Sequence, residues 1–432
     1  MGLAAAAPLF WGAAPSGGAR VAGTFVLPEI GLGAFQNAEL PGSITDDRGL
    51  LLGSVGSDLC RSPTDPPGIF WMTTDRGPNP LVKKKKEERR TFPVPAFTPH
   101  ILKVRAVDGR LEILDARPLV GASGRPVTGL PNLEGRDEAP YDEKGKTRIP
   151  VNGSGLDPEG LARMADGSFW ISEEYAPSVA RVDASGKVAA RIVPVGLGLR
   201  GADYEVDEVL PAILLDRRPN RGFEALALAS DGKTLYAGLQ SPLLHPGERA
   251  SESSRTTRIL ALEAATGRPL GEYAYALDTA PGPKREPLML SALTALPGGG
   301  LLALERPDDD ARVYRLDVSR ATDMLGSRWD LPSTRPSFES IDELATKDVS
   351  PIAKELVVDL GNLPGVPGKI EGLTVVDSRT IAIANDNDFG IAEGLGPKGA
   401  RANPSVLVLV ELPEELGARE QKPPRGSPSD QK

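Results

Sequence analysis

The sequence predicts an all-β protein of the β-propeller class, and three observations lead to this prediction. Glycine and proline number 48 and 41 among 432 residues, which suits many short strands joined by tight turns and argues against a helical bundle. A pattern of short apolar strands and Gly- or Asp-containing turns recurs along the chain. Polar residues recur at matching points of each copy, which a β-sandwich would not require.

Five copies of this pattern can be recognised. In each, a short apolar strand leads through a turn into a second apolar strand that ends at an acid or amide, and an alternating strand follows. The copies start at Gly53, Asp157, Asn220, Leu290 and Lys369. Their spacing is irregular, which indicates that loops are inserted between and within the repeating units.

We expect six blades, with the sixth assembled from leftover strands around residues 202–215 or from the meeting of the two termini. The second strands of three blades are expected at residues 169–172, 301–304 and 381–384. Any helix should be short and lie in an inserted loop.

The two ends of the chain and two inner stretches fall outside the repeating pattern. Residues 1–22 contain a short apolar stretch followed by small residues, and predict either a signal peptide or a disordered start. Residues 40–412 are expected to form the propeller domain, and the polar, proline-rich residues 413–432 a disordered tail. Residues 121–151 and 243–257 are expected to be long surface loops.

Composition and charge exclude several classes of protein. The net charge of −9 disfavours a nucleic-acid partner, and the basic run at residues 83–90 is interpreted as a solvated loop. One cysteine, Cys60, and two histidines exclude a disulfide framework and a metal centre rich in cysteine or histidine. No apolar run approaches the ~20 residues that span a bilayer, so we expect no membrane span.

Equivalent positions on the innermost strands of a propeller form a ring around its central channel. One such position, at the start of the strings EGL, EAL and EGL, is held by Glu159, Glu224 and Glu371, and in the other two copies by Ser291 and Ser57. A second ring is predicted where the second strands end, and consists of Asp75, Glu173, Gln240, Glu305 and Asp386.

Carboxylates that converge on one channel predict a cation among them, because like charges repel strongly when buried together. Oxygen ligands favour Ca²⁺ over zinc or copper. The string NDNDFG suits either a metal loop or a network of Asx turns. The expected metal ligands are Glu159, Glu173, Glu224, Glu305, Glu371, Asp386 and Asp388. Each acid taken singly is also explained by solvation at a strand end or by an ion pair with a nearby arginine.

Three arginines stand beside ring acids: Arg76 in DRGPN, Arg221 in NRGFE and Arg306 in LLALER. A guanidinium matches the geometry of phosphate oxygens, so we expect these residues to bind a small anionic substrate. The sequence contains no G-x-S-x-G elbow and neither histidine lies in a motif. A metal-activated water is therefore the expected nucleophile, and no catalytic side chain is assigned.

The succession DRGPN, DPEGLA…FWISEEY, NRGFEALA, LLALER and KIEGLTVV…NDNDFG resembles the phytase-like domain (esterase-like activity of phytase) over residues 40–412. The resemblance implies a propeller related to calcium-dependent alkaline phytases and alkaline phosphatases. It also implies hydrolysis of phosphoric esters in a secreted or periplasmic location, or in an organelle lumen of a plant or alga. The first blade departs from the family pattern, which puts contributions from Ser57 and Asp75 in doubt.

The sequence therefore predicts an exported, monomeric, calcium-dependent hydrolase that acts on a small phosphoester. Two alternatives stay open. A metal-dependent propeller lactonase or carboxylic esterase would use the same kind of carboxylate ring. A non-catalytic propeller would use its rim to bind a partner or ligand.

Overall fold

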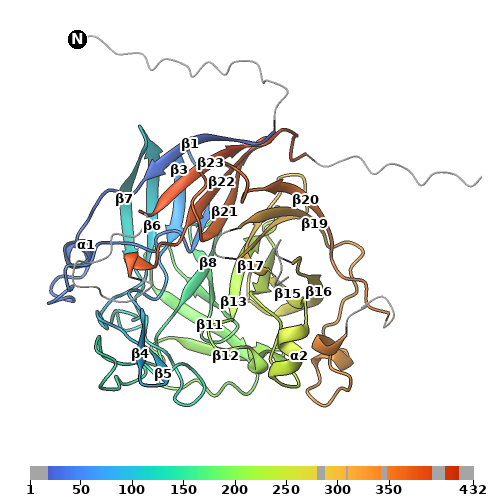
Figure 1. The fold of residues 1–432 in the computed structure, drawn as a ribbon, viewed down its shortest axis with the longest axis horizontal. Helices are drawn as coiled ribbons and strands as arrows, with labels where there is room; N and C mark the ends of the chain where they lie inside the picture. The colour runs from blue at the N-terminus through green and yellow to red at the C-terminus, as the bar shows by residue number, and fades with distance from the viewer. Residues whose placement is uncertain (1–17, 280–287, 308–309, 342–347, 392–403, 418–432) are drawn as a thin grey trace, which may run out of the picture.

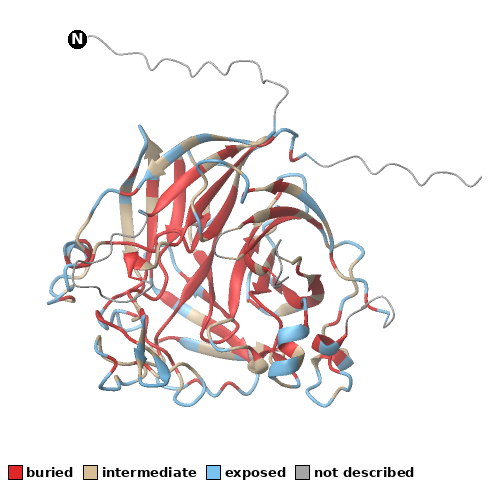
Figure 2. Ribbon diagram, viewed as in Figure 1, coloured by how far each residue is buried: buried red, intermediate tan, exposed pale blue. Residues whose placement is uncertain are grey.

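The computed structural model describes residues 18–279, 288–307, 310–341, 348–391 and 404–417. These residues form sheets that are arranged around a common axis (Figure 1). The innermost strands are buried along most of their length, whereas the outer strands and the connecting loops carry most of the exposed residues (Figure 2).

Five four-stranded blades account for the main sheets. The first blade contains β2 (Asp58–Cys60), β3 (Ile69–Thr73), β6 (His100–Val107) and β7 (Arg110–Pro118). The second contains β8 (Pro158–Arg163), β9 (Phe169–Glu173), β10 (Ser178–Val182) and β11 (Val188–Pro194), with β12 (Glu205–Leu210) added in parallel to β11. The third contains β13 (Phe223–Leu228), β14 (Thr234–Leu239), β15 (Thr256–Glu263) and β16 (Pro269–Ala276). The fourth contains β17 (Met289–Ala295), β18 (Leu301–Arg306), β19 (Arg312–Asp317) and β20 (Ala353–Asp359). The fifth contains β21 (Ile370–Asp377), β22 (Thr380–Asn385), β23 (Val406–Glu411) and β1 (Arg20–Val26).

The ring of blades closes on itself. Each innermost strand, in the order β2, β8, β13, β17 and β21, packs against the next, and β21 packs against β2. The N-terminal strand β1 pairs antiparallel with β23, so the two ends of the chain together complete the fifth blade. A single parallel pair, Val26 with Arg110, also joins the fifth blade to the first.

The prediction of a sixth blade is wrong for the part of the chain that the structure describes. Residues 202–215, which were expected to help build it, instead supply β12 to the second blade and most of the 3₁₀-helix η1 (Ala212–Asp216). The meeting termini complete the fifth blade instead. The expected second strands are confirmed by β9, β18 and β22.

The helices are short and lie in the connections between strands, as expected. Besides η1, the described helices are α1 (Leu32–Glu39), α2 (Glu248–Ser253), η2 (Arg328–Asp330), η3 (Phe338–Ser340) and η5 (Asp388–Gly390). The basic run forms a hairpin of β4 (Leu81–Lys84) and β5 (Glu87–Arg90), whose turn is exposed. No helix in the described segments has the length and hydropathy needed to cross a membrane.

The hydrophobic core is divided among the spaces between neighbouring blades. One cluster joins Trp170 and Ile192 of the second blade to Leu226 and Leu260 of the third, and other clusters join other pairs of adjacent blades. Each sheet therefore buries both of its faces against its neighbours.

The ordered domain is longer at both ends than expected. Strand β1 begins at Arg20, inside the expected leader, and Leu416 is only 4% exposed and packs in the core between the fourth and fifth blades. The remaining residues of the expected leader and tail, 1–17 and 418–432, lie outside the described residues.

Candidate functional site at the channel mouth

Four of the five innermost strands begin with a β-bulge, and the bulged residue is the one that repeats along the sequence. In β8 the pairing with β9 skips one residue, Glu159. The same shift of register skips Glu224 in β13, Ser291 in β17 and Glu371 in β21. A bulge turns a side chain away from the regular alternation of the strand. The three glutamates all line one cavity on the propeller axis.

Close packing explains the glycine that follows two of these bulges. A Cβ atom on Gly160 would lie 2.7 Å from Leu226 Cβ and 2.9 Å from the Leu226 nitrogen, and one on Gly372 would lie 2.6 Å from Leu59 Cδ2. These distances are shorter than van der Waals contact. The string EGL thus combines a bulged acid with a glycine that lets the next innermost strand approach.

The second ring forms where the second strand of each blade ends. Its cavity-lining members are Asp75, Glu174, Gln240, Arg306 and Asp386. The sequence predicted three of these positions correctly but named Glu173 and Glu305 in the other two blades. Adjacent residues of a strand face opposite sides, so only one of each pair can line the cavity.

Glu173 lies outside the cavity lining, in a closed network of hydrogen bonds. It pairs with the buried Arg191 and accepts hydrogen bonds from the backbone N–H groups of Asp157, Tyr175 and Ala176. Burial raises its pKa, while Arg191 and the N–H groups of Ala176 and Asp157 oppose the rise. Glu173, which the sequence predicted to be a metal ligand, instead anchors the start of β8.

Glu305 also points away from the cavity. Its carboxylate accepts hydrogen bonds from the Tyr275 hydroxyl at 2.6 Å and the Asp278 N–H at 2.9 Å, and it pairs with Lys354. All of its partners belong to the third and fourth blades and the loop between them. Glu305 is likewise a structural residue in this fold rather than part of the cavity ligand set.

The cavity has a volume of about 210 Å³ and receives side chains from all five blades. Its cationic lining residues are Arg76, Arg90, Arg221, Arg306 and Lys369. Its carboxylates are Asp75, Glu159, Glu174, Glu224, Glu371, Asp386 and Asp388. Every substrate-binding arginine predicted from the sequence, and five of the seven predicted metal ligands, therefore meet here.

One side of the cavity is acidic. Carboxylate oxygens of Asp157, Glu159 and Glu174 all lie within 4.8 Å of one another. Glu159 is only 8% exposed, and within the described ranges no hydrogen bond or ion pair reaches its carboxylate. Burial, followed by the charge of Glu224 and other nearby acids, raises the pKa of Glu159 well above its usual value. Arg76 offsets the charge of Asp157, but Glu159 contacts no cation among the described residues, so a bound cation would favour ionisation of all three carboxylates.

Two further oxygen atoms of the cavity residues lack a hydrogen-bond partner among the described residues. The Glu224 Oε2 and Gln240 Oε1 atoms are buried without a hydrogen-bond partner among the described residues, and both residues line the cavity. Buried polar atoms normally have a partner. The donor set consists of oxygen atoms alone, which fits Ca²⁺.

The sequence analysis missed Asp157 and Lys369 as site residues, although a signal for both was present. Each lies two residues before a ring glutamate, in DPEG and KIEG, so the string that carries the glutamate also carries the second charged residue. Glu174 was missed because it follows another acid, and only the strand register shows which of the two faces the cavity.

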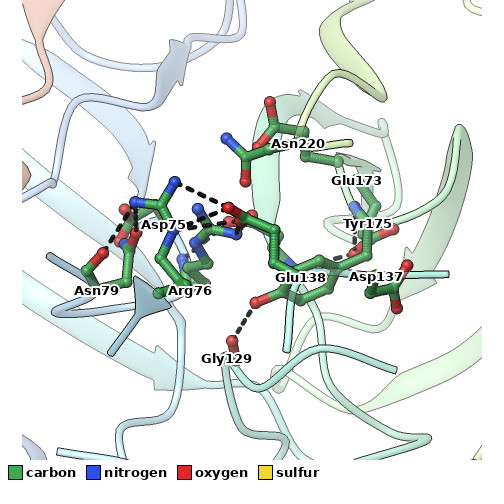
Figure 3. Close-up of polar contacts among 12 residues, drawn as sticks. Asp75, Arg76, Asn79, Gly129, Asp137, Glu138, Glu173, Tyr175 and Asn220 are labelled. Carbon is green, nitrogen blue, oxygen red and sulfur yellow. Dashed lines mark hydrogen bonds and ion pairs between the residues drawn. The ribbon is translucent and has the colours of Figure 1, made fainter. Parts of the chain in front are cut away.

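Arg76 holds Asp157 in place. Its Nη1 atom lies 3.1 Å from Asp157 Oδ2. The same atom lies 3.6 Å from Glu138 Oε2, and the guanidinium lies over the Tyr175 ring at 5.5 Å (Figure 3). The Tyr175 hydroxyl donates to the Gly129 carbonyl, which fixes the ring below the arginine (Figure 3). Arg76 is buried, so its main role is to position an acid.

Arg221 is the most exposed of the three predicted arginines. Its side chain is 37% exposed, and its Nη1 atom lies 3.9 Å from Glu174 Oε1. Among the described residues, the guanidinium otherwise donates only to the neighbouring Asn220 carbonyl, at 3.0 Å. This side chain can turn towards an anion at the acidic side once a cation is present there.

The opposite side of the cavity is neutralised by the protein itself. Arg306 pairs with Glu371, donates to Ser291 Oγ at 3.0 Å and lies 3.8 Å from Glu224. Lys369 Nζ lies 2.6 Å from Asp386 and also contacts Asp388.

The asparagines and the aspartates of the string NDNDFG have different contacts, and its interpretation as a metal loop stays a prediction. Asn385 Oδ1 accepts from the Val406 N–H at 2.8 Å and Asn387 Oδ1 from the Ser54 N–H at 2.7 Å, which fixes the loop. Asp386, which lies between these asparagines, and Asp388, which follows them, line the cavity. Ser57 is buried but is not part of the cavity lining, whereas Asp75 is.

The fold and site define a five-bladed propeller with an acidic cluster and several cations at the mouth of its channel. A family model described as phytase-like, esterase-like activity of phytase, matches residues 57–389, and the chain belongs to this family. An uncharacterized secreted protein of Arthroderma benhamiae is 27% identical over 337 residues, which cover 66% of this chain and 65% of that protein. The chain thus matches slightly less than two thirds of the relative's length.

Solved structures give weaker likenesses. The PQQ-bound aldose sugar dehydrogenase of Streptomyces coelicolor is 13% identical, with a TM-score of 0.36 and coverage of 92% of this chain and 100% of that chain. Regucalcin of Agrobacterium tumefaciens, a calcium-binding protein, is 13% identical, with a TM-score of 0.34 and coverage of 85% and 92%. These TM-scores are too low to bear on the fold or the activity.

Proposed function

We propose that the protein is an exported, Ca²⁺-dependent hydrolase of phosphoric esters that binds its substrate at the channel mouth. The main support is the convergence of Asp157, Glu159 and Glu174 within 4.8 Å, together with the lack of a partner for the buried Glu159 among the described residues. Membership of the phytase-like family supports the class of reaction. The secreted relative supports export.

Each cavity residue has a distinct part in this proposal. Asp157, Glu159 and Glu174 would hold the ion, which when bound would polarise a phosphoryl oxygen and acidify a water molecule. Arg221 would bind phosphate oxygens, while Arg76 would keep Asp157 in position. Burial and the neighbouring Glu174 raise the pKa of Glu224 to about 7. Glu224 is therefore the cavity group suited to accept a proton at neutral pH.

The cations in the cavity favour a phosphoester over a neutral ester. A guanidinium binds a phosphate through charge and paired hydrogen bonds, whereas a lactone or carboxylic ester carries no charge for it to meet. The exposed guanidinium of Arg221, next to the acidic side, would be of little use to a neutral substrate.

A divided substrate screen tests the proposal. p-Nitrophenyl phosphate and bis-p-nitrophenyl phosphate are compared with gluconolactone and p-nitrophenyl acetate, each with added Ca²⁺ and with a chelator. We expect hydrolysis of the phosphoesters that requires Ca²⁺. Preferential hydrolysis of the lactone or acetate would assign the protein to the carboxylic-ester class, and no turnover of any substrate would favour a binding module.

A further inference from the structure

We infer that the ammonium group of Lys369 occupies the place of a second metal ion, so that the channel mouth binds one divalent cation rather than two. The inference rests on the metal site of the proposed function and goes further by dividing the cavity. Its acidic half consists of Asp157, Glu159 and Glu174. Its second half, the lysine half, consists of Lys369 with three further carboxylates, those of Glu371, Asp386 and Asp388.

The lysine half has the donor set of a metal site. Lys369 Nζ lies 2.6 Å from Asp386 Oδ2, 2.5 Å from Asp388 Oδ1 and 3.8 Å from Glu371 Oε1. Three carboxylates thus contact one ammonium, although their oxygen atoms do not all lie within 4.8 Å of one another as those of the acidic half do. Oxygen donors in this number suit a divalent cation, and here a single protein charge takes its place.

The fold holds both ends of this contact firmly. Lys369 has φ +53° and Asp388 has φ +47°, which are left-handed conformations that are uncommon for residues other than glycine. Such conformations are unfavourable and persist where the surrounding structure imposes them. Ser54 also donates to Asp386, which fixes that carboxylate from the first blade. The ammonium is therefore a built part of the site rather than a mobile surface charge.

The two halves differ in how their charge is balanced. Lys369 contacts all three carboxylates of its half, and Arg306 adds a second cation at Glu371. In the acidic half, Arg76 divides its charge between Asp157 and Glu138, and Arg221 lies 3.9 Å from Glu174. No cation contacts Glu159 within the described ranges. An added divalent ion should therefore bind the acidic half and leave the lysine half unoccupied.

Counting bound ions tests this division directly. The number of Ca²⁺ ions per full-length chain is measured by isothermal titration calorimetry, with Tb³⁺ luminescence as a second readout. We expect one ion for the wild type and none for Glu159→Gln. Lys369→Ala should bind two ions, because removal of the ammonium takes away the cation that pairs with both Asp386 and Asp388. It leaves Glu371 paired with Arg306.

Lys354→Ala is the matched control. This lysine also contacts two acids, Glu305 and, at 3.3 Å, Asp278, but it lies outside the cavity lining. Its two carboxylates also accept hydrogen bonds from the hydroxyls of Tyr275 and Tyr314. We expect one bound ion for this variant. A second ion here would show that deletion of any paired lysine creates a site, which would overturn the inference.

Asp386→Asn keeps the test decisive even if the Lys369 variant fails to fold, because the amide preserves the size of the side chain. The inference predicts that this variant still binds one ion, since Asp386 is not a metal ligand. Loss of the ion in Asp386→Asn, two ions in the wild type, or one ion in a folded Lys369→Ala would each overturn it. Failure of the substrate screen alone would leave these ion counts unchanged and would count only against the hydrolase proposal.

Discussion

Arg221 has few contacts with the described residues of the folded protein, so its replacement tests substrate binding with little effect on stability. Its guanidinium is 37% exposed and meets one carboxylate at 3.9 Å. We expect Arg221→Ala to lower kcat/KM for p-nitrophenyl phosphate by at least about tenfold, or ~1.4 kcal/mol of transition-state stabilisation, because an anion contact is lost. The thermal unfolding temperature should not change. A kcat/KM close to that of the wild type would show that the anion is held elsewhere.

Arg306→Ala provides the contrasting case. Arg306 is buried, pairs with Glu371 and donates to Ser291. Its removal leaves the buried Glu371 with only the more distant Lys369, at 3.8 Å, among the described cations. Breaking a buried ion pair by removing one partner typically costs about 3–5 kcal/mol of unfolding free energy. We expect a smaller effect on kcat/KM than for Arg221→Ala and a large loss of stability in denaturant unfolding. An unchanged unfolding free energy together with a large loss of activity would instead make Arg306 the anion contact.

The same residues show the limits of sequence interpretation at this scale. The recurrence of acids correctly predicted that Glu159, Glu224 and Glu371 meet in one cavity. It could not decide between Glu173 and Glu174, because both are acids and the choice depends on the pairing register. In the fourth blade the strand register likewise determines that Arg306, and not Glu305, lines the cavity.

At the scale of single strands, the bulges give the site its shape. Because the innermost strands are buried on both faces, their sequences lack the alternation that would reveal a bulge. The second strands were easier to predict, since each is a short apolar run bounded by a turn and a polar residue. The string EGL coincides with two of the bulges, but nothing in the sequence alone identifies it as a bulge.

Gly160 offers a test of this packing. A Cβ atom at this position would lie 2.7 Å from Leu226 Cβ on the neighbouring innermost strand. We expect Gly160→Ala to lower the unfolding free energy by about 1–3 kcal/mol through overpacking, and to weaken Ca²⁺ binding because Glu159 is adjacent.

Gly247→Ala is the control for this substitution, since a Cβ there meets no atom within 4 Å. It should unfold like the wild type in the same denaturant series. Equal stability of the two variants would contradict the role assigned to the close approach of β8 and β13.

At the scale of the whole molecule, the blade count was the main error. The repeating pattern supplied the correct five copies, but a pattern count cannot show which strand completes the last blade. Strand β1 pairs with β23 from the opposite end of the chain, and its sequence carries no mark of that partner. A sixth blade was predicted because the terminal strands were assigned to a blade of their own, whereas they complete the fifth.

Buried acids should make the stability of the metal-free protein depend on pH. The folded pKa of Glu224 is about 7, above its usual value of 4.5, because of burial and then of Glu174. The pKa values of Asp157 and Glu159 are also raised, first of all by burial. Between the usual and the folded pKa the native state binds more protons than the unfolded state, so stability falls as pH rises through this range.

We therefore expect the unfolding temperature of the chelated protein to fall between pH 5 and pH 8, measured by calorimetry in ~0.15 M salt. Added Ca²⁺ should reduce this fall, because it binds the ionised carboxylates of the native state. A fall that is the same with and without Ca²⁺ would show that the acids respond to pH without forming a metal site.

The central claim is that Asp157, Glu159 and Glu174 bind the Ca²⁺ ion on which phosphoester hydrolysis depends. The most direct test is the Ca²⁺ dependence of kcat/KM for p-nitrophenyl phosphate, measured for the wild type and for Glu159→Gln. We predict that the wild type loses activity in chelator and regains it with Ca²⁺, whereas Glu159→Gln stays at least about a hundredfold less active at any Ca²⁺ concentration. Activity that survives chelation, or a Glu159→Gln variant that responds to Ca²⁺ like the wild type, would contradict the claim.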